Sequence, residues 1–136
     1  MRMEFLLLVA VLVIALVVLV LPRKMKVCLD SRCFEAEMAD NLLKRTIGLM
    51  FRSSISDDYA MIFFMNGSSG SFWMKNVNFP LELICIRDNV VVDIIQMEKC
   101  SGECKHYPTP SIDYAIEVKP GFCSNRGIKV GSRLSF

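Results

Sequence analysis

The chain is 136 residues long, which allows one domain, and its net charge of +2 depends on the residues that flank its N-terminal apolar run. From residue 27 onward, twelve basic residues stand against thirteen acidic ones, a net charge of −1. A nearly neutral domain of this kind offers no basic face, so we expect no nucleic-acid partner.

Residues 5–21 form an unbroken run of seventeen apolar residues. As a helix this run spans about 25 Å, just enough to cross the hydrocarbon core of a bilayer. A secretory signal ends in small residues suited to cleavage, whereas this run ends in Pro22-Arg23-Lys24. The sequence therefore favours an uncleaved, single-pass anchor over residues 1–26, with its basic flank among anionic headgroups, followed by one β-rich domain at 27–136.

Two features disagree about the side of the membrane on which the domain lies. The basic residues after the apolar run favour the cytoplasm under the positive-inside rule. Six cysteines within 27–136 favour an oxidising compartment. A two-residue turn at Asp30-Ser31 would place Cys28 opposite Cys33 at a separation that suits a disulfide, with two free thiols as the alternative. We therefore expect an extracytoplasmic domain.

Further along the chain, Asp40 is a good N-cap, and residues 41–51 form the expected main helix, with Leu43, Ile47 and Met50 on its core face. Apolar runs predict strands at 32–39, 59–64, 71–77, 81–86, 90–97, 114–118 and 128–136. Turn residues occupy 66–70 and 87–89, and a short helix fits 120–126. The pattern predicts a mostly β fold, an antiparallel sandwich or barrel with one helix packed on it.

Several short motifs occur in a characteristic order. Residues 34–39 read FEAEMA, 45–52 read RTIGLMFR, 72–76 read FWMKN, 79–84 read FPLELI and 127–134 read GIKVGSRL. In this order the chain resembles the prokaryotic family called domain of unknown function 192, over roughly residues 27–134. The resemblance implies a jelly-roll-like fold and carries no established reaction.

Arg45, Gly48 and Arg52 would form one stripe on the expected helix, opposite its core face. Two guanidinium groups placed in this way can hold a carboxylate or phosphate, or they can pair with acids of the domain such as Glu117 or Glu82. We expect Arg45 and Gly48 to have structural roles, and Arg52, at the helix end, to contact a ligand.

Strand alternation over 72–76 places Trp73 and Lys75 on one face and Asn76 among apolar neighbours on the other. Trp73 with Lys75 is a platform typical of sugar or peptide binding, although a single tryptophan often only packs. A buried Asn76 needs hydrogen bonds, which it would find by bracing the turn at Pro80 or by lining a pocket.

The segment around Cys100 and Cys104 allows several interpretations. A structural disulfide between the two is the simplest, whereas Cys100, Cys104 and His106 are three metal ligands that lack a fourth. Cys85 is expected to be a free buried thiol, with pairing to Cys123 left open. We expect no metal and no cofactor.

The residues support two main functional hypotheses. The first is a non-catalytic module that binds a polar or anionic ligand, or an envelope partner, through Arg52, Trp73, Lys75, Asn76, Tyr107 and Glu117. The second is a hydrolase of envelope glycan or peptide that uses Glu82 or Glu117 with Arg45 and Arg52. A thiol or metal protein is a third. The sequence contains no nucleophile elbow, phosphate loop or zinc-protease motif.

Overall fold

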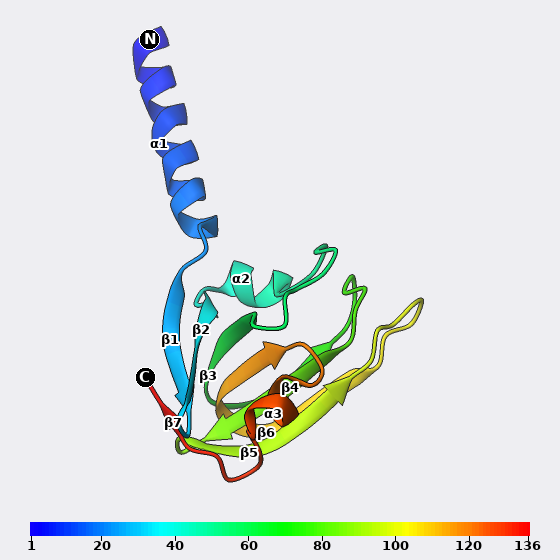
Figure 1. The fold of residues 1–136 in the computed structure, drawn as a ribbon. Helices are drawn as coiled ribbons and strands as arrows, with labels where there is room; N and C mark the ends of the chain where they lie inside the picture. The colour runs from blue at the N-terminus through cyan, green and yellow to red at the C-terminus, as the bar shows by residue number, and fades with distance from the viewer.

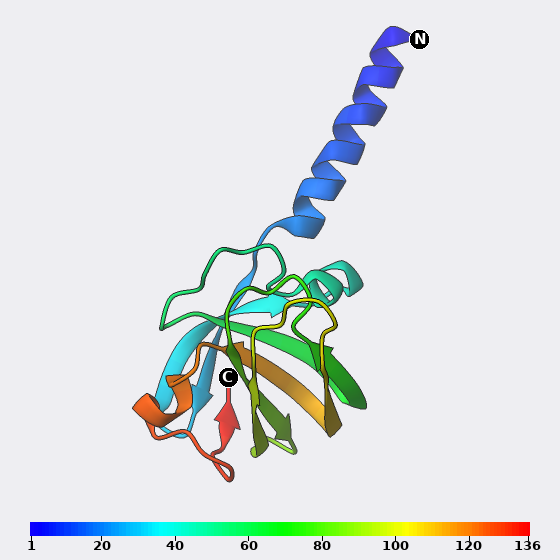
Figure 2. The ribbon, with the colours of Figure 1, turned by 90° about the vertical axis from the view of Figure 1, so that its right-hand side faces the viewer.

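The computed structural model describes all 136 residues, as a projecting N-terminal helix and one β-rich domain (Figure 1). The helix, α1 (Arg2–Val20), has no buried residue and points away from the domain in both perpendicular views (Figures 1 and 2). Its length and composition suit a membrane span, a property that signal sequences share.

Seven strands form one sheet in the order β5-β4-β6-β3-β2-β1-β7. Their bounds are β1 (Lys24–Leu29), β2 (Arg32–Ala39), β3 (Ala60–Trp73), β4 (Leu81–Arg87), β5 (Val90–Met97), β6 (His106–Val118) and β7 (Leu134–Ser135). The sheet curls until its two edges meet, because the Val91 N–H donates to the Ser132 carbonyl at 2.9 Å and the Leu134 N–H donates to the Asn89 carbonyl at 2.8 Å.

The expectation of a purely antiparallel sheet is wrong at one pair of strands. β2 and β3 run parallel, with Met38 opposite Ile62, while every other pair of neighbouring strands is antiparallel. Parallel neighbours need a crossover in place of a tight turn. Residues 40–59, which contain the main helix, form this crossover.

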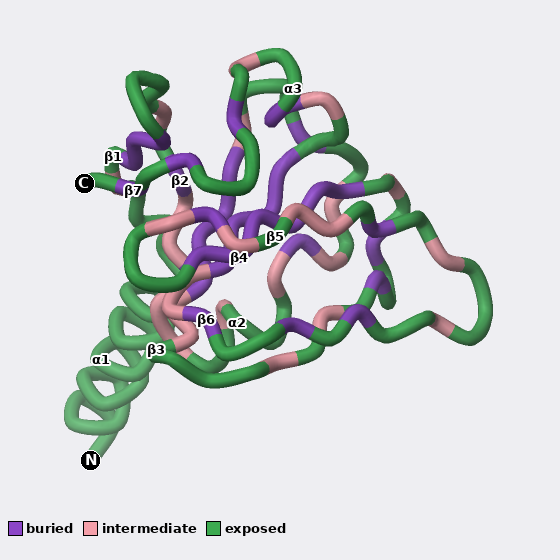
Figure 3. Tube along the Cα trace, turned by 90° about the horizontal axis from the view of Figure 1, so that it is seen from below, coloured by how far each residue is buried: buried purple, intermediate pink, exposed green.

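The two faces of the sheet carry separate apolar clusters. The first cluster draws on all seven strands and includes the short helix α3 (Phe122–Arg126) through Phe122 and Cys123. The second contains Leu83, Cys85 and Ala115 and extends to Leu49 and Val77 in the connecting loops. Buried residues concentrate along the strands (Figure 3). Residues next to each other on one strand therefore serve different cores.

The main helix is shorter than expected. α2 covers Leu42–Ile47, and its N-cap is Asn41, whose side-chain oxygen accepts a 2.8 Å bond from the Lys44 N–H. It ends at Gly48, where φ is +51°, a conformation that glycine adopts most easily. No residue of α2 is buried, so the expected core face is wrong, and Leu49, after the helix, enters the core in its place.

β3 and β6 are longer than the sequence predicted. Residues 66–70, expected as a turn, lie inside β3. There the register of β3 against β6 shifts twice between Phe64 and Gly70. β6 begins at His106 and takes in residues expected to be irregular. β3 ends at Trp73, so Asn76 is not in a strand.

Both predicted disulfides are formed. Cys28 pairs with Cys33 across the β1–β2 hairpin, with Cα atoms 4.0 Å apart, and Cys100 is bonded to Cys104. Cys85 and Cys123 are free and buried. They belong to the two different apolar clusters, which excludes a bond between them in this fold.

Candidate functional site

A cleft of about 540 Å³ lies between α2 and the sheet. One wall is the end of α2 and its terminal turn, residues 45–50, and the other is the second half of β3 from Phe63 to Trp73. Nine of the 17 lining residues are hydrophobic, and Glu117 of β6 is the single acidic one. Its size and its mixture of apolar and polar lining residues are typical of small-ligand sites.

Glu117 contributes a buried carboxyl group to this cleft. Burial raises its pKa to about 8, against a smaller lowering effect from the charge of Arg52, and no hydrogen bond contributes. No fully enclosed side-chain oxygen in the molecule lacks a hydrogen-bond partner, so the Glu117 carboxyl must be open to the cleft. At neutral pH it is therefore mostly a neutral acid that can donate one hydrogen bond.

Gly48, at the end of α2, lies close to this carboxyl. A Cβ atom at Gly48 would lie 3.6 Å from the Phe63 ring and 4.0 Å from Glu117 Oε2. Both distances are ordinary van der Waals contacts, so the positive φ of Gly48, and not a lack of space, favours glycine at this position.

The two arginines of the expected stripe have different surroundings. The Arg52 Nη2 atom lies 3.1 Å and 3.3 Å from the two Glu37 carboxylate oxygens, and the Arg52 guanidinium lies over the Tyr59 ring at 5.1 Å. Tyr59 also donates to Glu37 at 2.6 Å. Arg45 lines the cleft, is exposed and forms no ion pair. This is the reverse of what we expected: Arg52 is held by contacts within the domain, and Arg45 has no ion-pair partner.

Trp73 forms the aromatic end of the cleft. Its ring stacks on His106 at 5.4 Å, and the Lys75 ammonium lies 5.1 Å from its centroid. The expected pairing of Trp73 with Lys75 is therefore present, although Lys75 lies beyond the strand. His106, on the neighbouring strand β6, is 3.3 Å from the Ser71 hydroxyl through Nδ1.

Asn76 and Tyr107 lie outside the cleft. Asn76 is exposed with φ at +59°, and its carbonyl accepts from the Phe51 N–H at 3.0 Å, so the expectation of a buried amide is wrong. The chain has already left the strand, which ends the alternation on which that expectation depended. Tyr107 lines a separate cleft of about 310 Å³ beside the Cys100–Cys104 loop, where its hydroxyl accepts from the Glu98 N–H.

Glu82 does not share a site with Glu117. Leu83, and not Glu82, is opposite Glu117 across the β4–β6 pair, so the two carboxyl groups point to opposite faces of the sheet. Burial would raise the pKa of Glu82, but hydrogen bonds from the Gly121 and Cys123 N–H groups hold it below its usual value. Glu82 anchors the start of α3. Pro80 directly precedes β4.

The structure contains no group of three metal-ligating side chains, and the disulfide occupies both sulfur atoms of the Cys100, Cys104 and His106 set. Sequence reasoning missed the role of His106 beside Trp73, because that contact depends on the register of β3 against β6. It also exchanged the surroundings of Arg45 and Arg52.

Comparison with known proteins agrees with this fold. The sequence model of the family DUF192, described as "Uncharacterized ACR", matches residues 25–136. A protein of unknown function from Novosphingobium aromaticivorans has a similar structure, with a TM-score of 0.74 and 24% identity over 85% of this chain and 93% of that one. A Sinorhizobium meliloti protein described as a "putative transcription regulator" has a TM-score of 0.71 and 25% identity over 85% and 95% of the two chains. No curated protein matches the sequence.

Proposed function

This chain belongs to the DUF192 family, which is described as uncharacterised, and we propose a function for it from its own residues. The protein is a membrane-anchored, extracytoplasmic module that binds a small anionic ligand in the cleft beneath α2. The binding is non-catalytic. The ligand has an apolar body and a carboxylate or phosphate group.

One observation carries the proposal: a buried carboxyl group without a protein partner opens into an apolar cleft that also has a free guanidinium. A buried polar group without a partner is costly, and a ligand that accepts a hydrogen bond from it removes that cost. Glu117, protonated at neutral pH, supplies the donor, and Arg45 supplies the positive charge. Phe63, Phe72 and Trp73 supply apolar contact.

The membrane and compartment parts of the proposal have separate support. The helix α1 is long, apolar and wholly exposed, which suits a lipid environment. Two disulfides in a small domain suit an oxidising compartment on the outer side of the membrane. The jelly-roll-like arrangement implied by the family resemblance agrees with a sheet that curls until its edges meet.

A glycoside hydrolase would need a second carboxylate in the cleft. Glycosidases use two carboxyl groups about 5–9 Å apart. Glu82 is on the other face of the sheet and Glu37 is paired with Arg52, which leaves Glu117 alone. Binding is therefore the function that the cleft residues support best.

The test uses purified full-length protein in detergent and a matched pair of soluble probes. N-acetylphenylalanine carries a carboxylate, and its amide differs only in that group. We expect the acid to bind, measured by calorimetry or NMR, and the amide to bind at least about tenfold more weakly, in line with the loss of a charge-assisted pair. The same loss is expected for the acid with Arg45→Gln.

Arg87→Gln is the control, because Arg87 is also exposed and lies at the end of β4, outside the cleft. It should leave binding of the acid unchanged. Equal binding of acid and amide, or no effect of Arg45→Gln, would contradict the proposal. Turnover of a glycan or peptide substrate that is lost in Glu117→Gln would replace it with the hydrolase.

A further inference from the structure

Four large apolar side chains are exposed on and just after α2. The exposed fractions are 73% for Leu42, 38% for Leu43 and Ile47, and 76% for Phe51. At about 100° per residue, the three helix residues fall within an arc of about 140°. We call these four residues the apolar arc. Contiguous exposed apolar surface of this kind marks interaction sites on small proteins.

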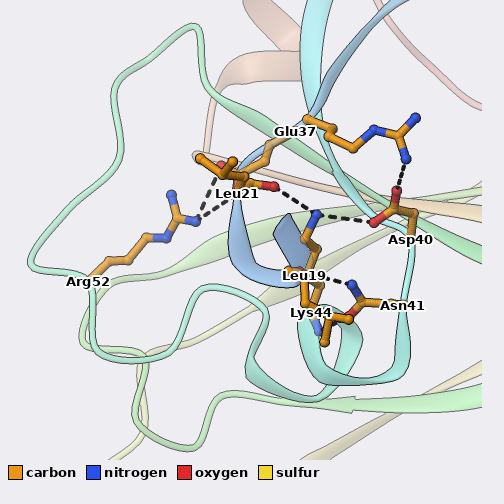
Figure 4. Close-up of polar contacts among 8 residues, drawn as sticks. Leu19, Leu21, Glu37, Asp40, Asn41, Lys44 and Arg52 are labelled. Atoms are coloured by element: carbon orange, nitrogen blue, oxygen red, sulfur yellow. Dashed lines mark hydrogen bonds and ion pairs between the residues drawn. The ribbon is translucent and has the colours of Figure 1, made fainter. Parts of the chain in front are cut away.

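The helix α2, which carries three of these four residues, lies at the end of the domain from which α1 leaves (Figures 1 and 2). The side chain of Asn41 donates to the Leu19 carbonyl at 3.2 Å, and the Lys44 ammonium donates to the Leu21 carbonyl at 3.0 Å (Figure 4). Asp40 accepts from both Lys44 and Arg23. These bonds tie the first turn of α2 to the last residues of α1.

Phe51 is held outward by its backbone. Its φ is +65°, which is uncommon for a bulky residue, and its N–H is bonded to the Asn76 carbonyl at 3.0 Å. Strained conformations of this kind persist where the surrounding structure imposes them, and they concentrate at functional positions. Here the result is an aromatic ring presented to the surroundings beside α2.

We propose that the apolar arc docks into the surface of the bilayer that α1 crosses, as a short interfacial element beside the anchor. The inference depends on the membrane anchoring in the proposed function. Where α1 leaves the hydrocarbon, the bonds from Asn41 and Lys44 hold α2 at the level of the headgroups. Apolar side chains with basic neighbours are typical of elements that lie in this interface.

The charges around the apolar arc fit an anionic lipid surface. Lys24 and Lys26 are exposed just after the anchor, and the Arg23 side chain is also largely exposed. Basic residues at this depth are attracted to anionic headgroups. Docking would also hold the cleft beside the membrane, since α2 forms one of its walls.

The test places a tryptophan in the apolar arc and measures its contact with lipid. Trp73 is the single tryptophan of the chain, so Phe51→Trp is made together with Trp73→Phe. The full-length variant is reconstituted, one chain per nanodisc, in phosphatidylcholine with phosphatidylglycerol, with and without lipids that carry a nitroxide quencher near the headgroup. We expect the quencher to lower the emission at position 51 at least about twofold.

The matched control is Val130→Trp in the same Trp73→Phe background. Val130 is also exposed, at 58%, and lies in the loop before β7, at the end of the domain away from α1 (Figure 1). Its emission should not change. Leu42→Trp is a second probe of the arc, for use if the Phe51 variant does not fold, and it should be quenched like position 51.

Each outcome has a separate meaning. Equal, weak quenching at positions 42, 51 and 130 in chains that have entered the nanodisc would overturn membrane docking and leave the anchor intact. A chain that does not enter the nanodisc would contradict the anchor itself. A third outcome is that quenching is absent in single-chain nanodiscs and position 51 becomes buried only at two chains per disc. This would assign the arc to a second copy of the protein and overturn the lipid proposal.

Discussion

Glu117 is the residue whose chemistry depends most on its surroundings. Its carboxyl is buried on the face of the sheet that carries the second apolar cluster, and this burial raises its pKa to about 8. The folded protein binds this proton more tightly than the unfolded chain does, so protonation of Glu117 stabilises the folded state. This contribution is complete below about pH 4.5 and is lost as the pH rises to about 8.

Glu117→Gln should remove this pH dependence, because the amide is neutral throughout. We expect wild-type stability to fall between about pH 5 and pH 8.5, by an amount on the order of a few kcal/mol. The stability of the variant should fall less over this range, and above about pH 8 the variant should be more stable than the wild type. Thermal unfolding of both full-length proteins from pH 5 to pH 9 measures this. Parallel curves would show that Glu117 is ionised in the folded state.

The two arginines of the RTIGLMFR motif give a second prediction at the residue scale. Arg52→Ala leaves the partly buried Glu37 without its cation and should cost about 1–3 kcal/mol of unfolding free energy. Arg45→Ala removes an exposed side chain without an ion pair and should change stability by less than about 0.5 kcal/mol. Denaturant unfolding compares them. A large loss for Arg45→Ala would mean that it pairs within the domain.

Among the elements, the β1–β2 hairpin and the 100–104 loop depend on disulfides. We expect that native protein, treated with an alkylating reagent without reduction, gains no label, and that denaturation adds two labels, on Cys85 and Cys123. Both thiols are buried, and burial raises the pKa of each to about 12, so neither reacts in the folded protein. Intact mass after labelling gives the count.

A different number of labels would change the compartment to which we assign the domain. Four or more labels on the native protein, isolated from its host, would mean that both disulfides are reduced there. The positive-inside rule would then place the domain in the cytoplasm. The control is the same protein after reduction and denaturation, which must gain six labels.

At the scale of the whole molecule, the proposed membrane anchoring gives the last prediction. Burying seventeen apolar residues in lipid far exceeds peripheral attachment, so the full-length protein should stay with membranes through high-salt and carbonate washing. Fractionation followed by N-terminal mass analysis checks this. Soluble protein with an intact N-terminus would contradict the anchor, and a shortened chain would identify residues 1–26 as a cleaved signal.

The sequence by itself determined the features that arise from neighbouring residues. The apolar run of α1, the turn at Asp30-Ser31 and the strands β2, β4 and β5 follow from local composition and alternation, and the structure has them within one residue of where they were expected. The Cys28–Cys33 pair follows from the turn, because a two-residue loop fixes the register of its hairpin. The family assignment likewise depends only on motifs in order.

The tertiary structure alone decided which residues meet. Gly48 ends α2 in a positive-φ conformation, so Arg45 and Arg52 leave the common stripe and take different partners. The parallel β2–β3 pair and the register of β6 bring Glu117 beneath Gly48 and His106 beside Trp73. These contacts join residues far apart in the chain. Their positions depend on the packing of the whole sheet, which a local pattern does not contain.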